Sequence, residues 1–131
     1  MVNEKWRLKI ADFDTARLKV DENSQTFRGK VVGSPSYMAP EMLNNGEYTA
    51  RADVYSIGIL TNELARRVVE GRYTAPYTER SVPNLAGGMG VLIYAAGAKQ
   101  GRPVVCERTP ALLRTLIEAE WRKNCLILSH V

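Results

Sequence analysis

Cysteine and histidine are scarce in this sequence, which has two cysteines and one histidine in 131 residues. Cys106 and Cys125 are too few for a disulfide framework or a cysteine-rich zinc site. His130 is the penultimate residue, so a catalytic Ser-His-Asp or Cys-His arrangement has little to build on. No apolar run approaches the roughly twenty residues of a transmembrane helix, and the polar residues 1–9 are unlike a signal peptide. We therefore expect a reduced, cytoplasmic protein that makes no membrane contact.

A strong excess of charge of either sign is also lacking. The 18 basic and 14 acidic residues give a net charge of +4, and the basic residues are scattered. Such scatter favours a solvated face over a nucleic-acid surface, which would need a platform of aromatic and basic side chains. Hydrophobic residues make up 45% and charged residues 24% of the chain, an ordinary globular mix. We expect one folded domain, or part of a larger one, with no nucleic-acid partner.

The first third of the chain predicts a strand followed by a long loop. Apolar and other residues alternate between Trp6 and Phe13, a pattern typical of a short, half-buried strand. Residues 14–32 are polar and irregular, as in a long loop, and long loops in compact domains are often functional or mobile.

The rest of the chain predicts helices. Residues 52–68 place an apolar stripe at helical spacing and predict a well-buried helix, with Thr49 or Asp53 as its N-terminal cap. Residues 71–90 are rich in glycine and proline and predict a connection, and residues 91–99 predict a weaker helix. Thr109 and Pro110 begin a further helix. The stripes consist of Val54, Ile57, Leu60, Leu64 and Val68 in the first helix and Leu112, Leu113, Leu116, Ile117 and Trp121 in the last.

Four short blocks occur in a fixed order along the chain. They are Asp12-Phe13-Asp14; the nine residues 33–41, GSPSYMAPE; residues 53–58, DVYSIG, with 62–64, NEL; and 101–103, GRP, with Leu116, Ile117 and Trp121. The second block followed at this distance by the third is highly specific. From about residue 8 to residue 124 the chain resembles the protein kinase family, and its second block is similar to the Ser/Thr type or the tyrosine-kinase-like group.

The resemblance implies a mainly α fold: part of the large, C-terminal lobe of the α+β kinase fold, with a short strand remnant at its N-terminus. Residues 1–131 would form one incomplete kinase-like domain. Within it, residues 1–13 would be the strand and its DFD motif, residues 14–41 the activation segment up to APE, and residues 42–131 the helical subdomain.

The resemblance also implies ATP and Mg²⁺ as cofactors, or none for this chain alone. Phosphoryl transfer requires charge neutralisation, and a carboxylate that holds Mg²⁺ contributes to it. Asp12 would be that carboxylate, and Phe13 would pack inward and set its direction. The activation segment would include Phe13 and Asp14, and its hydroxyl groups are candidate phosphorylation sites: Thr15, Ser24, Thr26 and Ser34.

Further roles follow from the same resemblance. The substrate-positioning residues would be Ser34, Pro35, Ser36 and Tyr37. Asp53 would brace the catalytic loop, although a plain helix cap explains it equally well. The structural residues of the motifs would be Glu41, Asp53, Gly58, Arg102 and Trp121.

The sequence departs from the family pattern in several places. A Gly-rich loop, a strand lysine and an HRD loop with its catalytic base are absent from the sequence. Asp14 replaces the usual glycine, which allows backbone angles that other residues resist. The position of the usual arginine partner of Glu41 is Leu128, and the usual nearby proline is Cys125. Either Glu41 is exposed, or Arg102 or Arg122 takes that role. Residues 125–131 stop matching, so we expect a domain that is incomplete at both ends.

The sequence therefore supports two main functions. The chain is part of a Ser/Thr-type kinase whose parent transfers the γ-phosphoryl group of ATP to proteins, or it is a catalytically inactive, pseudokinase-like interaction module. Its partner would be a protein substrate or another kinase segment. A small nucleic-acid binder is the third and weakest alternative. By the resemblance, the helix that carries Val54 to Val68 would pack against the catalytic loop and the helices before it. Without them its apolar stripe would lose part of its cover, so we expect a marginally stable chain.

Overall fold

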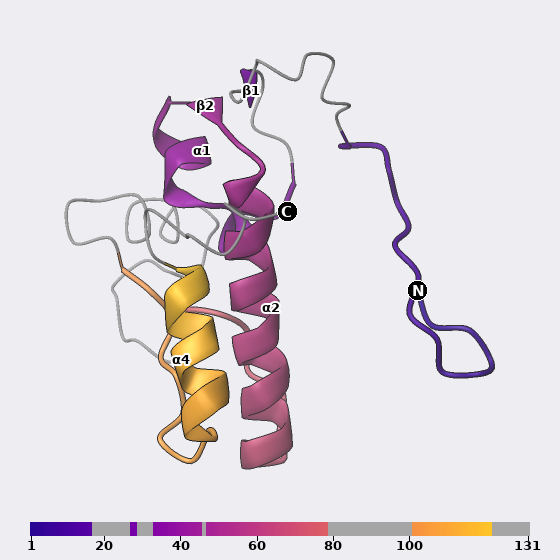
Figure 1. Ribbon diagram of the computed structural model, residues 1–131, viewed down its shortest axis with the longest axis vertical. Helices are drawn as coiled ribbons and strands as arrows, with labels where there is room; N and C mark the ends of the chain where they lie inside the picture. The colour runs from indigo at the N-terminus through magenta and orange to yellow at the C-terminus, as the bar shows by residue number, and fades with distance from the viewer. Residues whose placement is uncertain (17–26, 29–32, 46, 79–100, 122–131) are drawn as a thin grey trace.

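The computed structural model describes residues 1–16, 27–28, 33–45, 47–78 and 101–121 (Figure 1). In these residues the elements are β1 (Phe27–Arg28), the 3₁₀ helix η1 (Pro35–Tyr37), α1 (Pro40–Asn45), β2 (Glu47–Tyr48), α2 (Arg51–Glu70) and α4 (Ala111–Glu120). Helices α2 and α4 lie side by side and run in opposite directions, with η1, α1 and β2 at the N-terminal end of α2. The described fold is mainly helical, as predicted. The helix expected over 91–99 and the tail 125–131 lie outside the described residues.

The expected strand over residues 6–13 is not formed. This segment makes one isolated bridge between Val2 and Leu8 and lies apart from the helices (Figure 1). Trp6, Leu8 and Ile10 are 88%, 83% and 86% exposed. A strand with one buried face needs a neighbouring strand and a layer beneath it. The described residues provide neither, so alternation alone does not bury these side chains.

A two-residue strand lies within the segment predicted as a loop. β1 pairs antiparallel with β2, and Phe27 is opposite Tyr48 while Arg28 is opposite Glu47. The pairing ties the segment before η1 to the turn that precedes α2.

Helix α2 begins and ends close to where the sequence places it. Ala50 is the N-cap residue, and the Thr49 hydroxyl accepts a hydrogen bond from the Arg51 amide at 3.3 Å. Asp53 lies in the first turn, where a carboxylate favours the helix dipole. At the other end Gly71 has φ +71° and donates its amide to the Arg67 carbonyl at 3.0 Å. Glycine adopts this left-handed conformation readily, so it stops the helix.

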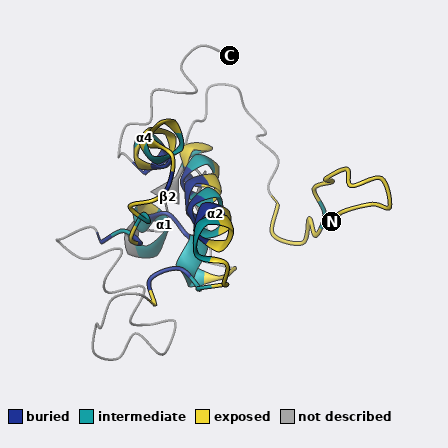
Figure 2. Ribbon diagram, turned by 90° about the horizontal axis from the view of Figure 1, so that it is seen from below, coloured by how far each residue is buried: buried dark blue, intermediate teal, exposed yellow. Residues whose placement is uncertain are grey.

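The buried face of α2 is not the predicted one. Ile57, Leu60, Leu64 and Val68 are 53%, 47%, 55% and 83% exposed. The buried residues are instead Ala52, Tyr55, Gly58, Ile59, Asn62, Ala65 and Arg66. In Figure 2 the buried side of α2 faces α1 and α4, and the exposed side turns away from them. The stripe was chosen for hydrophobicity, whereas the core side is rich in small residues that allow other elements to approach closely.

The core lies between α2, α4 and the segments that cross them. Ile59, Tyr77 and Ile117 are its largest fully buried side chains. Tyr77 has φ +69°, an uncommon angle for a tyrosine, and its hydroxyl lies 2.7 Å from that of Tyr55. Burial and this contact hold the turn after α2 against the helix.

Helix α4 begins one residue later than the sequence predicts. Pro110 is the N-cap residue and Ala111 the first helical residue, a shift within the usual uncertainty of helix ends. Ile117 and Trp121 from the predicted stripe are buried, whereas Leu112 is 88% exposed. In the part of the chain that the structure describes, no helix is both long and apolar enough to cross a membrane.

Candidate functional site

Residues 34–37 form a short 3₁₀ turn at the surface. Ser34 is exposed and has an extended backbone, and Pro35 opens η1 at a position that suits its fixed φ. The Tyr37 amide donates to the Ser34 carbonyl at 3.1 Å, and the Met38 amide donates to Pro35 at 3.2 Å. Gly33, just before the turn, has φ +121°. Only glycine adopts that angle without strain, so the sequence specifies how the chain enters η1.

Helix α2 supports this turn through side chains on one face. The Ser56 hydroxyl lies 2.8 Å from the Tyr37 carbonyl and 3.0 Å from the Ala52 carbonyl, and can donate to either. The Tyr37 hydroxyl donates to Oε2 of Glu63 at 2.8 Å. Met38 is buried directly after the turn. Tyr37, one of the four residues to which the resemblance gives a substrate-positioning role, is therefore fixed to α2.

The contact with Glu63 changes the acidity of Tyr37. Partial burial, followed by the hydrogen bond to the Glu63 carboxylate, raises the pKa of Tyr37 well above its usual value near 10. Glu63 also raises the pKa of Tyr73 by acting as a hydrogen-bond acceptor. The phenol of Tyr37 therefore stays a neutral donor at physiological pH.

The Tyr37→Phe variant should lose about 1–2 kcal/mol of unfolding free energy at neutral pH, because it removes a hydrogen bond to a charged acceptor. The folded-state pKa lies above the unfolded one, so this stabilisation is complete below about pH 10 and decreases as pH rises further. Urea unfolding between neutral pH and about pH 11 should show a steeper alkaline loss in the wild type than in the variant.

The matched control for Tyr37→Phe is Glu63→Gln, which keeps an acceptor but removes the charge that raises the Tyr37 pKa. The decrease in unfolding free energy of Glu63→Gln at alkaline pH should lie between that of the wild type and that of Tyr37→Phe. Parallel pH curves for all three proteins would show that the contact contributes nothing in solution.

Asp12, the expected metal ligand, belongs to the N-terminal segment, which lies apart from the helices (Figure 1). Asp12 is exposed and has φ +63°. Phe13 is 66% exposed, so the expected inward packing is absent. Asp14 and Thr15 are also exposed. Ser24 and Thr26, two of the candidate phosphorylation sites, lie outside the described residues. Among the described residues no group of three or more His, Cys, Asp or Glu side chains could hold a metal ion.

Glu41 and Asp53 are both exposed. For Glu41 this matches the first of the two alternatives from the sequence. The charge of Glu41 still reaches Tyr55, whose pKa is raised mainly by burial, and Arg102 acts on the same phenol in the opposite direction.

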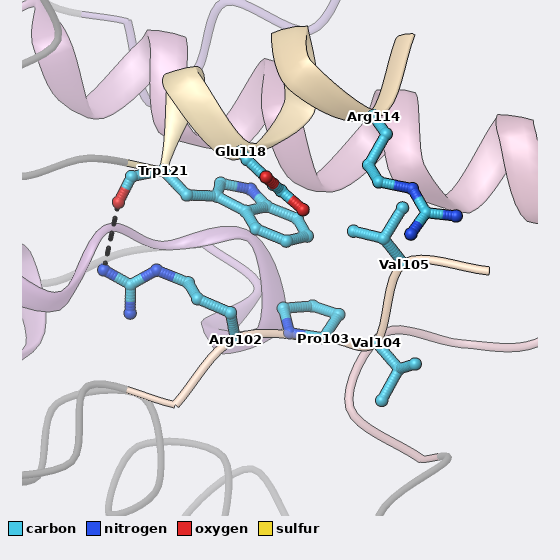
Figure 3. Close-up of a pocket in the computed structure, with 7 residues that line it drawn as sticks. All are labelled: Arg102, Pro103, Val104, Val105, Arg114, Glu118 and Trp121. Atoms are coloured by element: carbon cyan, nitrogen blue, oxygen red, sulfur yellow. Dashed lines mark hydrogen bonds between the residues drawn. The ribbon is translucent and has the colours of Figure 1, made fainter. Parts of the chain in front are cut away.

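Arg102 connects the segment before α4 to both long helices. Its Nη2 donates to the Trp121 carbonyl at 3.2 Å, and its guanidinium carbon lies 5.1 Å from the centre of the Tyr55 ring, within the range of a cation–π contact. Figure 3 shows Arg102 and Pro103 beneath the Trp121 ring, with Arg114 and Glu118 on the α4 side of an open pocket. The Asn62 amide donates to the Val104 carbonyl at 3.2 Å and fixes the same segment to α2.

Gly58 allows α4 to approach α2 closely. A Cβ atom at Gly58 would lie 2.8 Å from Nε1 of Trp121 and 3.0 Å from Cβ of Glu120. Oε2 of Glu120 and Nε1 of Trp121 are buried and have no hydrogen-bond partner among the described residues. Burial raises the pKa of Glu120. The absence of a side chain at Gly58 therefore leaves room for the Trp121 ring.

Sequence reasoning gave no role to Ser56 or Glu63, although both fall in quoted blocks. They are seven residues apart, which is about two helical turns, and therefore lie on one face of α2. Two polar residues at this spacing on a mostly apolar helix could have indicated a shared neighbour, which the structure identifies as Tyr37.

Comparison with known proteins identifies the family of this chain. The sequence-family model of the protein kinase domain matches residues 1–77, which is more than half of the chain. The chain belongs to the protein kinase family. It is 38% identical over 117 residues to a probable serine/threonine-protein kinase of Dictyostelium discoideum, covering 89% of this chain and 12% of that protein. It is 34% identical over 124 residues to stress-activated protein kinase alpha of the same organism, covering 95% of this chain and 19% of that kinase.

This kinase chain thus spans less than a fifth of the length of these two relatives. A cysteine-rich receptor-like protein kinase of Arabidopsis thaliana is 40% identical over a shorter stretch of 65 residues. The kinase resemblance inferred from the four blocks is confirmed.

The family implies Mg²⁺ and ATP, and the described residues of this kinase chain do not form a site for them. Mg²⁺ is usually held by one or two carboxylates together with phosphate oxygens and water. Asp12 and Asp14 are exposed on a segment that lies apart from the helices (Figure 1). We therefore assign no step of phosphoryl transfer to the described residues alone.

Proposed function

We propose that this chain is the substrate-positioning part of the large lobe of a protein kinase domain. In its full-length parent, that domain would transfer the γ-phosphoryl group of ATP to a serine or threonine hydroxyl of a protein. The observation that carries this proposal is the seating of Ser34–Tyr37 on α2. Two contacts, Ser56 with the Tyr37 carbonyl and Tyr37 with Glu63, fix a surface turn to the longest helix of the described structure.

A fixed turn suits this chemistry because phosphoryl transfer depends on positioning and on electrostatic stabilisation. A turn anchored at its carbonyl and its phenol presents the exposed Ser34 side at a constant angle to an incoming peptide. Asp53, exposed in the first turn of α2, is available to brace a catalytic loop supplied by the parent. In that parent Asp12 would be the carboxylate that holds Mg²⁺.

The segment before the turn would be the activation segment. Thr15 is exposed and accessible to another kinase. A phosphate on Thr15, Ser24, Thr26 or Ser34 would add negative charge that arginine side chains can bind, which would order the segment. The parent would act in the cytoplasm on protein partners.

The second candidate is a pseudokinase-like module that binds proteins without transferring phosphate. Asp14 in place of glycine favours it, since a second carboxylate beside Asp12 can repel nucleotide phosphates.

The deciding experiment compares the 131-residue chain with the longest protein expressed from its transcript. Isothermal titration calorimetry would measure binding of Mg²⁺-ATP, and radiolabel transfer would be followed to serine, threonine and tyrosine peptides. The chain alone should show neither binding nor transfer. A longer protein that carries an HRD loop should phosphorylate serine or threonine, and Asp12→Ala should slow that transfer on the order of 10²-fold or more.

The matched variant for Asp12→Ala is Asp14→Gly, which restores the usual family residue. Gain of nucleotide binding only in Asp14→Gly would favour the pseudokinase candidate. A longer protein that carries an HRD loop but neither binds ATP nor transfers phosphate would refute the kinase proposal. Saturable, Asp12-dependent binding by the chain alone would contradict the conclusion that the described residues form no nucleotide site.

A further inference from the structure

Arginine side chains from separate segments meet one glutamate at the C-terminal end of α2. Arg66 binds Glu70 through two atoms of its guanidinium: Nε lies 3.1 Å from Oε1, and Nη2 lies 3.4 Å from Oε2. Arg72, in the turn after the helix, has its Nε 3.9 Å from Oε2 of the same carboxylate, which is longer than a hydrogen bond. Arg66 is 7% exposed, whereas the Arg72 side chain is 79% exposed. The buried arginine therefore binds Glu70 closely, and the exposed one binds it only loosely.

Arg108 approaches the same carboxylate from the turn before α4. The hydrogen bond from Arg66 lowers the pKa of Glu70, and the charges of Arg66, Arg72 and Arg108 act in the same direction. Because α2 and α4 run in opposite directions, the end of α2 and the start of α4 lie at the same end of the helix pair (Figure 1). Arg108 is exposed. Positive charge is therefore in excess around Glu70, even with the exposed Glu107 counted.

The turn that carries Arg108 is fixed by hydrogen bonds. The Thr109 amide donates to the Cys106 carbonyl at 3.0 Å. From α4, Nη2 of Arg114 donates to the same carbonyl at 3.2 Å and also to the Glu107 carbonyl. Arg108 therefore extends from a backbone that is attached to α4 on both sides of the turn.

This end of α2 differs from the apolar stripe that the rest of a kinase domain would cover. Asp53, which would brace the catalytic loop of the parent, lies in the first turn of α2, and Glu70 is its last residue. With a rise of 1.5 Å per residue, the two lie about 25 Å apart along the helix axis. Unpaired arginines are also costly to bury. We therefore expect the guanidinium groups of Arg72 and Arg108 to stay in contact with water in the parent.

The charge and geometry of this arginine cluster (Arg66, Arg72 and Arg108) suit a single phosphate group. A guanidinium binds phosphate oxygens through paired, charge-assisted hydrogen bonds. The three arginines converge on one carboxylate, so the cluster matches one anionic group, whereas RNA or an anionic membrane requires a longer basic surface. We propose that Arg72 and Arg108 bind the phosphate of a phosphorylated serine or threonine in a partner peptide, beside the Arg66–Glu70 pair. This site does not depend on whether the parent transfers phosphate.

Fluorescence anisotropy with the 131-residue chain tests the proposal. The probe is a short, labelled, glycine-rich peptide with one central phosphoserine, and its twin carries serine at that position. The phosphopeptide should bind at least about tenfold more tightly, because its twin lacks the charge-assisted hydrogen bonds. Arg72→Glu and Arg108→Glu should each weaken binding of the phosphopeptide by about tenfold or more, because each replaces a donor by a charge that repels phosphate.

The matched control is Arg51→Glu, which makes the same change of charge at the exposed first residue of α2. It lies at the far end of the helix and should change the affinity by less than about twofold. Thermal melts followed by far-UV circular dichroism check that each variant folds. Equal affinity for the two peptides, or binding that Arg72→Glu and Arg108→Glu leave unchanged, would overturn the proposal. So would an equal loss in Arg51→Glu, which indicates general charge attraction, or tighter binding of a short single-stranded RNA.

Discussion

The Trp121→Ala variant is expected to lose about 3–5 kcal/mol of unfolding free energy, the range for truncation of a buried tryptophan or phenylalanine. Trp121 is 7% exposed and lies at the end of α4 against Gly58 of α2. Its ring also covers the Arg102–Pro103 segment (Figure 3). Because small domains have only about 5–15 kcal/mol of total stability, this loss would remove a large part of it.

Urea denaturation followed by circular dichroism at 222 nm measures this loss. The matched control is Trp6→Ala, because Trp6 is 88% exposed. That change should shift the unfolding free energy by less than about 0.5 kcal/mol. Equal effects of the two substitutions would mean that α4 does not pack on α2 in solution as it does here.

The Gly58→Ala variant is expected to be less stable than the wild type by up to about 2 kcal/mol. In an isolated helix the same substitution would stabilise by about 1 kcal/mol, because alanine is the better helix former. Here the added Cβ would lie 2.8 Å from Nε1 of Trp121, and overpacking of this kind typically costs about 1–3 kcal/mol. The close approach of α2 and α4 therefore decides whether Gly58→Ala stabilises or destabilises the protein.

A double-mutant cycle isolates this clash. In the Trp121→Ala background the contacts with the Trp121 ring are gone and the one with Cβ of Glu120 at 3.0 Å remains, so Gly58→Ala should cost much less than it does in the wild type. The two effects should therefore be far from additive. A stabilising Gly58→Ala in the wild-type chain would show that α4 sits farther from α2.

The sequence predicts where α2 lies but not which side of it is buried. Periodicity places the helix at 52–68, and the structure gives Arg51–Glu70. Periodicity cannot tell which neighbour will approach, and the side with Gly58, Ala52 and Ala65 accepts α4 and η1 because small residues let backbones come close. The N-terminal segment fails for a related reason, since the alternation from Trp6 to Phe13 creates a buried strand face only where another layer covers it.

For the site, the sequence singles out residues 34–37 but predicts neither their turn nor its support. Residues 33–41, followed by the third block, are specific enough to indicate the family, and η1 falls within them. The contact between Tyr37 and Glu63 joins residues 26 positions apart, and this depends on how η1 crosses α2. The roles of Asp12 and the activation segment remain predictions, because they depend on residues outside the described parts of the chain.

The opposite environments of the two tryptophans give the chain a built-in optical probe. Trp6 is 88% exposed and Trp121 is 7% exposed, and the sequence contains no other tryptophan. In Trp6→Phe the intrinsic fluorescence would come from Trp121 alone. The wavelength of its emission and its quenching by iodide would then report how closely α4 sits on α2, without any attached label. Partner binding, phosphorylation and chain extension could each be tested for whether they reach the helical core.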